Sequence, residues 1–410
     1  MQGPLDRIPG ILPDRVRRVV ERETPIPTVA ARAAEMKRTH PELVRADIGQ
    51  IVGLDGVEDV LYGPPPGLPE LRAALAETWN LAMGLGDAEG PGSIAAANVA
   101  ICSGAAEGLS ILLRCFASGK TVGLPRGHWE NYANGVDLAG GEIVLVDYFD
   151  AEGRLDVAGI GEAIARHGIG VLVTNFPTNP TGSVLEDAEY AALAAVVAER
   201  DVVVIADEVY NRLRFDGHAP RTLVRFAPAH AVAVSSASKE YLLPGARVGY
   251  VVSARPIVTD LVMKKMIRAN TASPNVLGQR KLLEYLEPDL EDLRAGRTPR
   301  FIARVREEMR RRRDGLLAVL ERHGIRTVGR SGRAPAGTIF LMAGLPEWWS
   351  GDDVGFVEAA LSRGLFSSVP GSAFGLPGSV RLSYGAMTPP EIARFDAALE
   401  TMRREAGAGR

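Results

Sequence analysis

The sequence predicts an α/β protein in which a mainly parallel sheet is wrapped by helices. Short apolar runs alternate with helical patterns through the middle of the chain. The run Val202–Ala206 is apolar with no polar alternation, as expected of a strand covered on both faces. Strands that alternate with helices form parallel sheets through right-handed crossover connections.

The expected elements of this large domain follow the same alternation of strands and helices. Apolar runs predict strands at Asn98–Ile101, Thr121–Leu124, Ile143–Asp147, Val171–Asn175, Val202–Ala206, Ala231–Ser235 and Val248–Val252. Helical spacing predicts helices at Glu70–Trp79, Leu109–Phe116, Leu155–Arg166 and Glu186–Glu199.

The C-terminal part predicts a smaller α+β domain. A long charged helix is expected at Phe301–His323, and Gly324 would end it. Strand-like segments follow at Thr338–Met342 and Val380–Ser383, and a closing helix begins at Pro389. The first residues lack the β/α alternation. We therefore expect residues 1–55 to join the small domain, residues 56–285 to form the large domain and residues 286–410 to form the small domain.

Composition and charge argue against several classes of protein. The 410 residues are 46% hydrophobic and 24% charged with a net charge of −3, which indicates neither a nucleic-acid nor an anionic-membrane partner. No run of about 18 apolar residues predicts a membrane-spanning helix, and the N-terminus does not read as a signal peptide. The two cysteines, Cys102 and Cys115, have no metal-binding or disulfide spacing, which fits a reducing cytoplasm.

Five local motifs follow predicted strands in a definite order. In Ser103–Gly108, small residues between a strand and a helix let backbone N–H groups approach an anion. Asn175–Gly182, with the sequence NFPTNPTG, predicts a rigid loop at the carboxyl end of the sheet. Ala206–Tyr210 places an acid at the end of an apolar strand, where it needs a cationic partner. Ser236–Lys239 and Pro244–Tyr250 complete the series.

Together these motifs resemble the class I and II aminotransferases, a family of fold-type-I pyridoxal-phosphate enzymes. The resemblance extends from about residue 47 to residue 383 and depends on the order of the NPTG, DEVY, SASK and PGARVGY segments. It implies the aminotransferase fold, pyridoxal 5'-phosphate as cofactor, amino acid and keto acid substrates, and a homodimer with shared active sites.

The resemblance implies a role for each residue that would contact the cofactor ring. Lys239 would hold the cofactor aldehyde as a Schiff base and then move a proton at the substrate α-carbon. Asp207 would pair with the pyridinium nitrogen and keep the ring an electron sink. Tyr210 and Asn179 would hydrogen-bond the phenolic oxygen. Trp129 would stack on the ring, although its spacing from the preceding strand departs from the usual one and His128 competes for this position.

Other residues would bind the phosphate and the substrate by the same resemblance. The expected phosphate ligands are Gly104, Ala105, Ala106, Ser236, Ser238 and Arg247, and an arginine fork suits phosphate oxygens. Tyr62 would reach the phosphate of the neighbouring subunit. Arg381 would bind the substrate α-carboxylate as a planar bidentate pair, with Asn179 and Gly49 beside it.

The motifs do not by themselves name the reaction. The main prediction is an aminotransferase that moves the α-amino group of an L-amino acid to a keto acid. The alternative is a non-transaminating enzyme of the same fold, which catalyses β- or γ-elimination or replacement, cyclisation or oxidation, because the same cofactor supports all of these reactions. The unusual His128–Trp129 and Gly49–Gly53 segments keep this alternative open.

Overall fold

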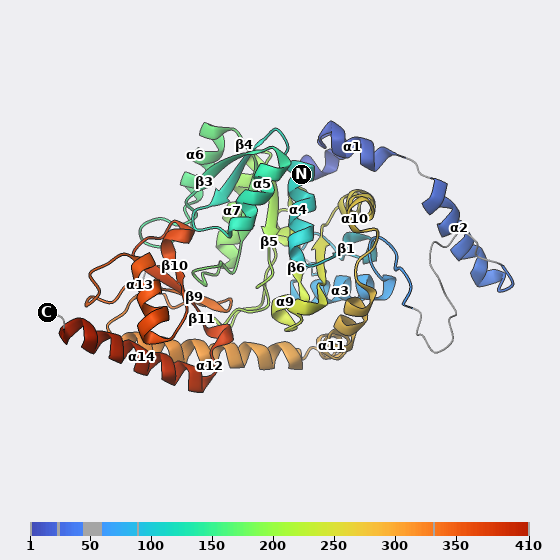
Figure 1. Cartoon of the computed structure of the whole chain (residues 1–410). Coiled ribbons are helices and arrows are strands. Elements are labelled where there is room, and N and C mark those ends of the chain that lie inside the picture. Colours follow the sequence, from blue (N-terminus) through green and yellow to red (C-terminus); the bar gives the residue numbers. More distant parts are fainter. Residues whose placement is uncertain (1, 23–24, 44–59, 88–89, 331–332, 409–410) are drawn as a thin grey trace.

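The computed structural model describes residues 2–22, 25–43, 60–87, 90–330 and 333–408. A seven-stranded sheet forms the centre of the large domain, and a four-stranded antiparallel sheet forms the centre of a small one (Figure 1). Among the helices of the described part of the chain, none combines the length and the apolar character needed to cross a bilayer.

The large sheet is mainly parallel, as predicted. In order across the sheet its strands are β1 (Val99–Cys102), β7 (Gly249–Val252), β6 (Ala231–Ser236), β5 (Val203–Asp207), β4 (Ile169–Asn175), β2 (Thr121–Pro125) and β3 (Glu142–Val146). Strand β7 runs antiparallel to both of its neighbours, whereas the pairs from β6 to β3 are parallel.

Helices cover both faces of this sheet because successive strand residues point to opposite sides and both sides are apolar. One face carries α4 (Ala105–Phe116), α5 (Glu130–Ala139) and α10 (Lys264–Thr271). The other carries α3 (Pro69–Ala82), α6 (Val157–His167), α7 (Asp187–Glu199), α8 (Leu223–Phe226) and α11 (Val276–Arg294).

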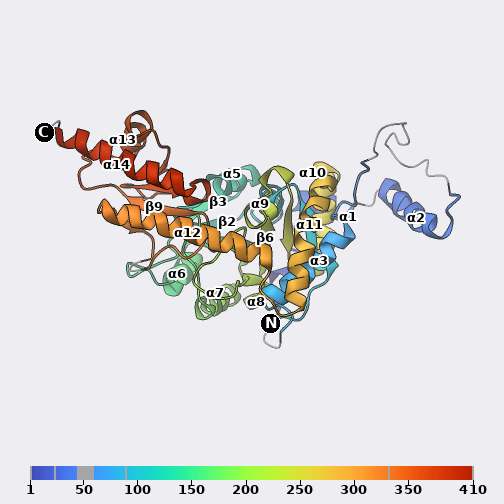
Figure 2. The same cartoon turned by 90° about the horizontal axis from the view of Figure 1, so that it is seen from below.

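The small domain is joined to the large one by a long helix, α12 (Arg300–Arg322), which runs along the base of the molecule (Figures 1 and 2). Its sheet contains, in order, β10 (Val369–Pro370), β11 (Ser379–Ser383), β9 (Phe340–Gly344) and β8 (Thr327–Val328). Helices α13 (Asp353–Ala359) and α14 (Pro389–Ala408) pack on it. Strand β9 begins two residues later than predicted because Thr338 has a φ of 69°, which a strand does not allow.

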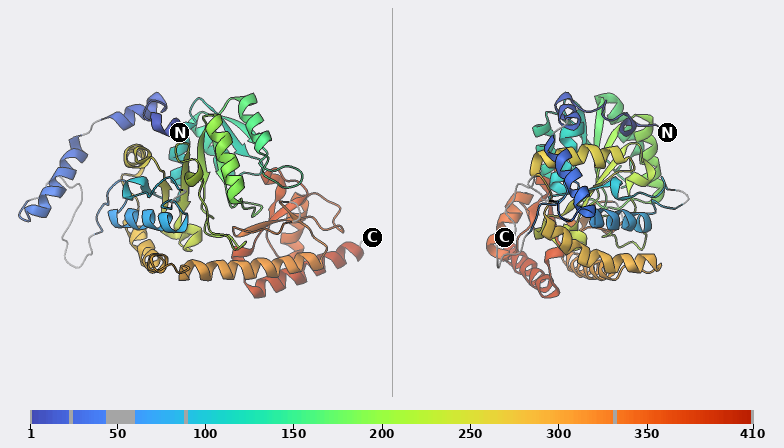
Figure 3. Two further views of the ribbon diagram at one scale, coloured as in Figure 1. Left: turned by 180° about the vertical axis from the view of Figure 1, so that it is seen from behind. Right: turned by 90° about the vertical axis from the view of Figure 1, so that its right-hand side faces the viewer.

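The first helical residues lie elsewhere than expected. Leu5, Leu12 and Val16 pack with Met263 and Ile267 against the large sheet. Helix α1 (Asp14–Glu21) lies beside α10, and α2 (Pro25–Thr39) follows it, both on the side of the large domain away from the small domain (Figures 1 and 3). Residues 5–20 therefore do not join the small domain, because their apolar side chains are buried on the large one. The domain boundaries at residues 55 and 285 stay predictions.

Candidate active site

The carboxyl ends of the central strands bring the predicted residues to one edge of the sheet. In the β4–β5 register, Asn175 lies opposite Asp207. Strand β6 ends at Ser236 and is followed directly by α9 (Ala237–Glu240), which carries Lys239. Residues that are far apart in the sequence meet here because parallel strands end at the same edge, where ligands bind in open α/β sheets.

Asp207 is a carboxylate at this edge with only 3% of its surface exposed. Its Oδ2 accepts a hydrogen bond from the Tyr132 hydroxyl at 2.5 Å, and its Oδ1 accepts one from the Val209 backbone N–H at 3.2 Å. Burial raises the pKa of Asp207 to about 6, while these hydrogen bonds and the positive charge of Lys239 oppose the rise. A buried acid whose hydrogen-bond donors, the Tyr132 hydroxyl and the Val209 backbone N–H, are neutral suits a ligand that brings a positive charge.

Lys239 and Tyr210 lie near the same carboxylate. Burial and the positive charge of Arg381 lower the pKa of Lys239, and the negative charge of Asp207 opposes this shift. Both effects make the neutral amine, which is the form that attacks a carbonyl carbon, easier to form than in a free lysine. Burial and the charge of Asp207 raise the pKa of Tyr210, so its phenol keeps its proton and can donate a hydrogen bond.

Arg381 reaches this edge from β11 of the small domain. Its Nη1 donates to Asn179 Oδ1 at 3.1 Å, and the Asn179 backbone N–H donates to Asn175 Oδ1 at 2.7 Å. The guanidinium carbon lies 4.3 Å from the ring centre of Phe340 and 4.8 Å from that of Phe374. The two rings and the amide hold a planar cation in a fixed orientation, which suits a carboxylate ligand.

The predicted phosphate residues gather where β1 and β6 end and β7 begins. The register aligns Cys102 with Gly249 and Gly249 with Ser236. Gly104 has a φ of 81°, and a Cβ there would lie 2.5 Å from Arg247 Nη2, so only glycine lets the arginine approach.

Helix α4 begins directly after this glycine, with Ala105 and Ala106 in its first turn. Ser236 caps α9 by accepting a hydrogen bond from the Ser238 backbone N–H at 3.3 Å. The backbone N–H groups of the first turn of α4 and the Arg247 guanidinium therefore form an arrangement that suits an anion.

Two aromatic rings flank Tyr132. Trp129 is partly buried and meets Tyr132 edge-on, with ring centres 5.8 Å apart. The His128 ring lies nearly parallel to that of Tyr132, with centres 6.5 Å apart and an angle of 21°. Sequence reasoning missed Tyr132, although it lies only three residues after Trp129, because nothing in the sequence shows that α5 points it at Asp207.

Two predicted residues lie apart from this arrangement or outside the described chain. Tyr62 is 73% exposed on the segment before α3. Gly49 lies outside the described residues. Their assigned roles stay predictions.

A buried cluster of charged and polar groups around Arg212 packs against α9. Helix α9 has four residues and is too short to be stable by itself. The Arg212 backbone N–H donates to Glu240 Oε1 at 3.2 Å, and Arg212 Nη1 donates to the Tyr241 hydroxyl at 2.6 Å. Asp289 Oδ2 of α11 lies 3.7 Å from Arg212 Nη2. These contacts hold Glu240 and Tyr241, the two residues that follow Lys239, against Arg212.

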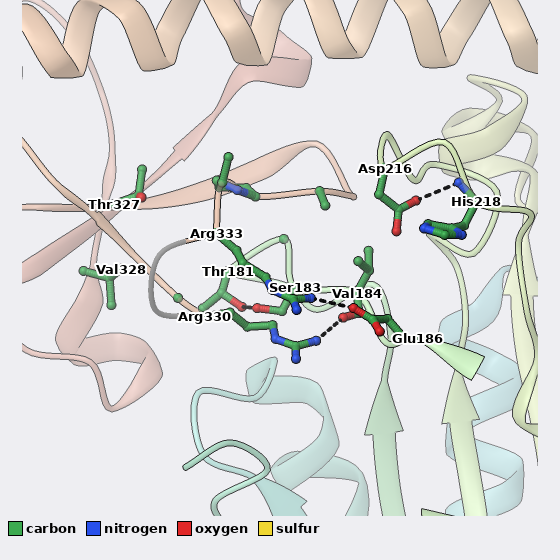
Figure 4. Close-up of a pocket in the computed structure, with 15 residues that line it drawn as sticks. Thr181, Ser183, Val184, Glu186, Asp216, His218, Thr327, Val328, Arg330 and Arg333 are labelled. Carbon is green, nitrogen blue, oxygen red and sulfur yellow. Dashed lines mark hydrogen bonds and ion pairs between the residues drawn. The ribbon is translucent and has the colours of Figure 1, made fainter. Parts of the chain in front are cut away.

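Two cavities adjoin this edge. One, of about 240 Å³, is lined by His128, Tyr132, Asn175 and Asn179 among others. The other, of about 200 Å³, lies between the loop at residues 181–186 and small-domain residues 327–330 and 333–336 (Figure 4). The charged groups that line this second cavity are paired: Arg333 with Glu186 at 2.8 Å (Figure 4), Arg330 with Glu189 at 2.6 Å and Asp216 with Arg214 at 2.6 Å. It is therefore a contact between the domains rather than the candidate site.

The match to known proteins agrees with this geometry. The model of the family described as "Aminotransferase class I and II" matches residues 28–399. The chain belongs to the class I and II aminotransferase family. The aspartate/prephenate aminotransferase of Thermus thermophilus is 32% identical over 386 residues, which cover 90% of this chain and 93% of that protein. The aspartate aminotransferase of Bacillus subtilis is 26% identical over 352 residues, with 84% and 83% covered.

Solved structures of this aminotransferase family have the same fold. The Thermus thermophilus aspartate aminotransferase solved with maleate has a TM-score of 0.72 at 28% identity, covering 96% of this chain and 99% of that chain. The aromatic aminotransferase of Pyrococcus horikoshii has a TM-score of 0.71 at 26% identity, with 95% and 94% covered. The predictions of family, fold, enzyme class and amino-group transfer are confirmed.

Proposed function

We propose that this aminotransferase holds pyridoxal 5'-phosphate at Lys239 and moves the α-amino group of an L-amino acid to a keto acid. The observation that supports this most directly is the buried Asp207 carboxylate at the same edge as the half-buried Lys239 amine. A pyridinium nitrogen needs an anionic partner, and an aldehyde needs a neutral amine. When bound, the cofactor supplies an electron sink for the bond broken at the substrate α-carbon.

The proposed phosphate contacts come from three elements. The backbone N–H groups of Ala105 and Ala106, next to Gly104, would bind at the first turn of α4. Ser236 and Ser238 would add hydroxyl groups from the start of α9. The positive charge of Arg247 would complete the site, because the glycine beside it leaves room for the guanidinium.

The substrate would bind between the two domains. Arg381 and Asn179, which already contact each other, would bind its α-carboxylate. Lys239 would accept the α-proton, and burial and the charge of Arg381 lower the pKa of its amine. Tyr210 would donate to the phenolic oxygen of the cofactor, and Trp129 would cover the ring. Gly49 is kept as a proposed neighbour of the carboxylate from the sequence alone.

One experiment separates transamination from the alternative chemistry. A panel of single amino acids is added to protein loaded with pyridoxal 5'-phosphate, without any keto acid. We expect one of them to convert the cofactor to the pyridoxamine form in a 1:1 ratio with the active sites, and a keto acid to reverse this with ping-pong kinetics. If an amino acid is instead consumed over many turnovers without a keto acid, the elimination, cyclisation or oxidation reaction replaces transamination.

We also propose a homodimer with shared active sites in a reducing cytoplasm. The buried free thiols of Cys102 and Cys115 fit such a compartment. Val60, Leu61 and Tyr62 are 47%, 44% and 73% exposed, which supports burial of this segment against a second copy. A twofold interface would use the same segment on both subunits.

Tyr62→Phe tests this assembly. Loss of one hydroxyl contact to the phosphate, worth about 1 kcal/mol, should weaken cofactor retention by roughly fivefold while the dimer persists. Cofactor release during dialysis and sedimentation equilibrium measure the two effects. A monomer with full activity would contradict the shared site.

A further inference from the structure

We infer that His128 is a specificity-determining residue that accepts a hydrogen bond from the substrate side chain. The substrate class is then L-amino acids whose uncharged side chain carries an O–H or N–H donor. This inference rests on the proposed function, because it assumes that the amino acid binds between Lys239 and Arg381.

The cavity of about 240 Å³ is the space next to the proposed carboxylate site. It shares Asn179 with that site, and Asn179 holds Arg381. It is also lined by Tyr132, whose hydroxyl donates to the Asp207 carboxylate, and by Asn175, whose Nδ2 donates to the Asp207 backbone carbonyl oxygen. A substrate bound through its α-carboxylate therefore has this cavity beside it for its side chain.

The hydrogen bonding of His128 fixes which ring nitrogen is free. Its Nδ1 lies 3.1 Å from the carbonyl oxygen of Pro125, and because a carbonyl only accepts, Nδ1 carries the proton. Burial lowers the pKa of His128, so the neutral ring is favoured at neutral pH. Nε2 then keeps a lone pair, and no group of the described residues donates a hydrogen bond to it.

The ring is also held in place. One of its faces lies against Tyr132, and the Tyr132 hydroxyl is bonded to Asp207 at 2.5 Å. The contact with Pro125 holds the other end of the imidazole. A fixed acceptor that would be buried by the substrate discriminates against analogues that lack the matching donor, because it would be left unpaired.

The remaining lining of the cavity argues for an uncharged side chain. Arg126 Nε donates to Asp147 Oδ1 at 2.7 Å, and Asp150 pairs with Arg154 at 2.9 Å. The rings of Phe149 and other aromatic residues form much of the remaining wall. A charged side chain would have to displace one of these ion pairs. An uncharged side chain with a hydrogen-bond donor could instead donate to the free Nε2 of His128.

The test compares amino acids that differ by one donor. The probe pairs are L-tyrosine with L-phenylalanine and L-threonine with L-valine, and L-aspartate is the charged probe. The rate of the first half-reaction is measured for the wild type, His128→Phe and His128→Gln.

We expect the wild type to prefer the amino acid with the donor in at least one pair by roughly 100-fold. His128→Phe should reduce this preference to below about threefold, and His128→Gln, whose amide oxygen accepts, should restore at least about tenfold. His167→Phe, at an exposed position on α6, is the matched control and should leave the preference unchanged.

The outcomes separate the two proposals. If no amino acid converts the cofactor in the wild type, the proposed function fails and the inference fails with it. If transfer occurs but both members of each pair react equally, or L-aspartate reacts faster than every uncharged probe, only the inference is overturned. A loss of thermal stability in His128→Phe with an unchanged preference would also overturn it, because that is the result expected of packing alone.

Discussion

Lys239→Ala is expected to lower amino-group transfer by roughly 10⁴-fold, the upper range for a positioned proton-transfer residue. The amine lies beside the buried Asp207 and is held at the end of a four-residue helix. No other lysine is proposed for this site, so no side chain would replace the missing amine. The phosphate contacts at the start of α4 do not involve Lys239, and the variant should still bind the cofactor.

The loss of activity is measured by single-turnover kinetics, and cofactor binding by equilibrium dialysis. Lys281→Ala is the matched control, because that exposed lysine on α11 pairs with Glu284 and should leave the rate unchanged. Borohydride reduction of the wild type should fix the cofactor to the peptide that contains Lys239. A reduced adduct on another lysine would show that the assignment is wrong.

Asp207→Asn is expected to have the second largest effect, a 10²- to 10³-fold loss of turnover, or about 3–4 kcal/mol of transition-state stabilisation. The amide oxygen of asparagine can accept from the Val209 backbone N–H and its amide nitrogen can donate to the Tyr132 hydroxyl. It carries no charge, however, that would hold a proton on a pyridine nitrogen. Near-normal turnover of the variant would mean that Asp207 does not partner the ring.

The same substitution should stabilise the protein without cofactor. Burial raises the pKa of Asp207 from 3.8 to about 6, so the folded state favours the protonated acid. The stability from this proton is fully present below about pH 4 and is lost as the pH rises through 6. At pH 7.5 the ionised carboxylate then costs about 3 kcal/mol, which asparagine does not incur.

Urea unfolding of the cofactor-free proteins at pH 5 and pH 7.5 measures this difference. The gain in unfolding free energy of Asp207→Asn over the wild type should be larger at the higher pH. Tyr132→Phe is the matched control, because it removes a hydrogen bond from the carboxylate and should have the opposite sign. A variant that is less stable than the wild type at both pH values would contradict the pKa shift.

The sequence by itself determined the fold class and the family. The alternation of apolar runs with helical spacing shows the sheet, because buried parallel strands need helices on both faces. The motifs around Asn179, Asp207 and Lys239 could be read in order because each follows a strand directly, so the strand fixes where its last residue lies. These signals are local, so they can be recognised from one amino-acid sequence.

Only the tertiary structure decided which side chains meet. It brings Tyr132 to Asp207 and Arg212 to Glu240, and it places α1 on the large domain. It also gives two neighbouring residues different contacts with Tyr132. The Trp129 ring meets Tyr132 edge-on, whereas the His128 ring lies nearly parallel to it. Such contacts depend on the register of strands and the rotation of helices set by packing between distant segments. Neither quantity is encoded in the spacing of neighbouring residues.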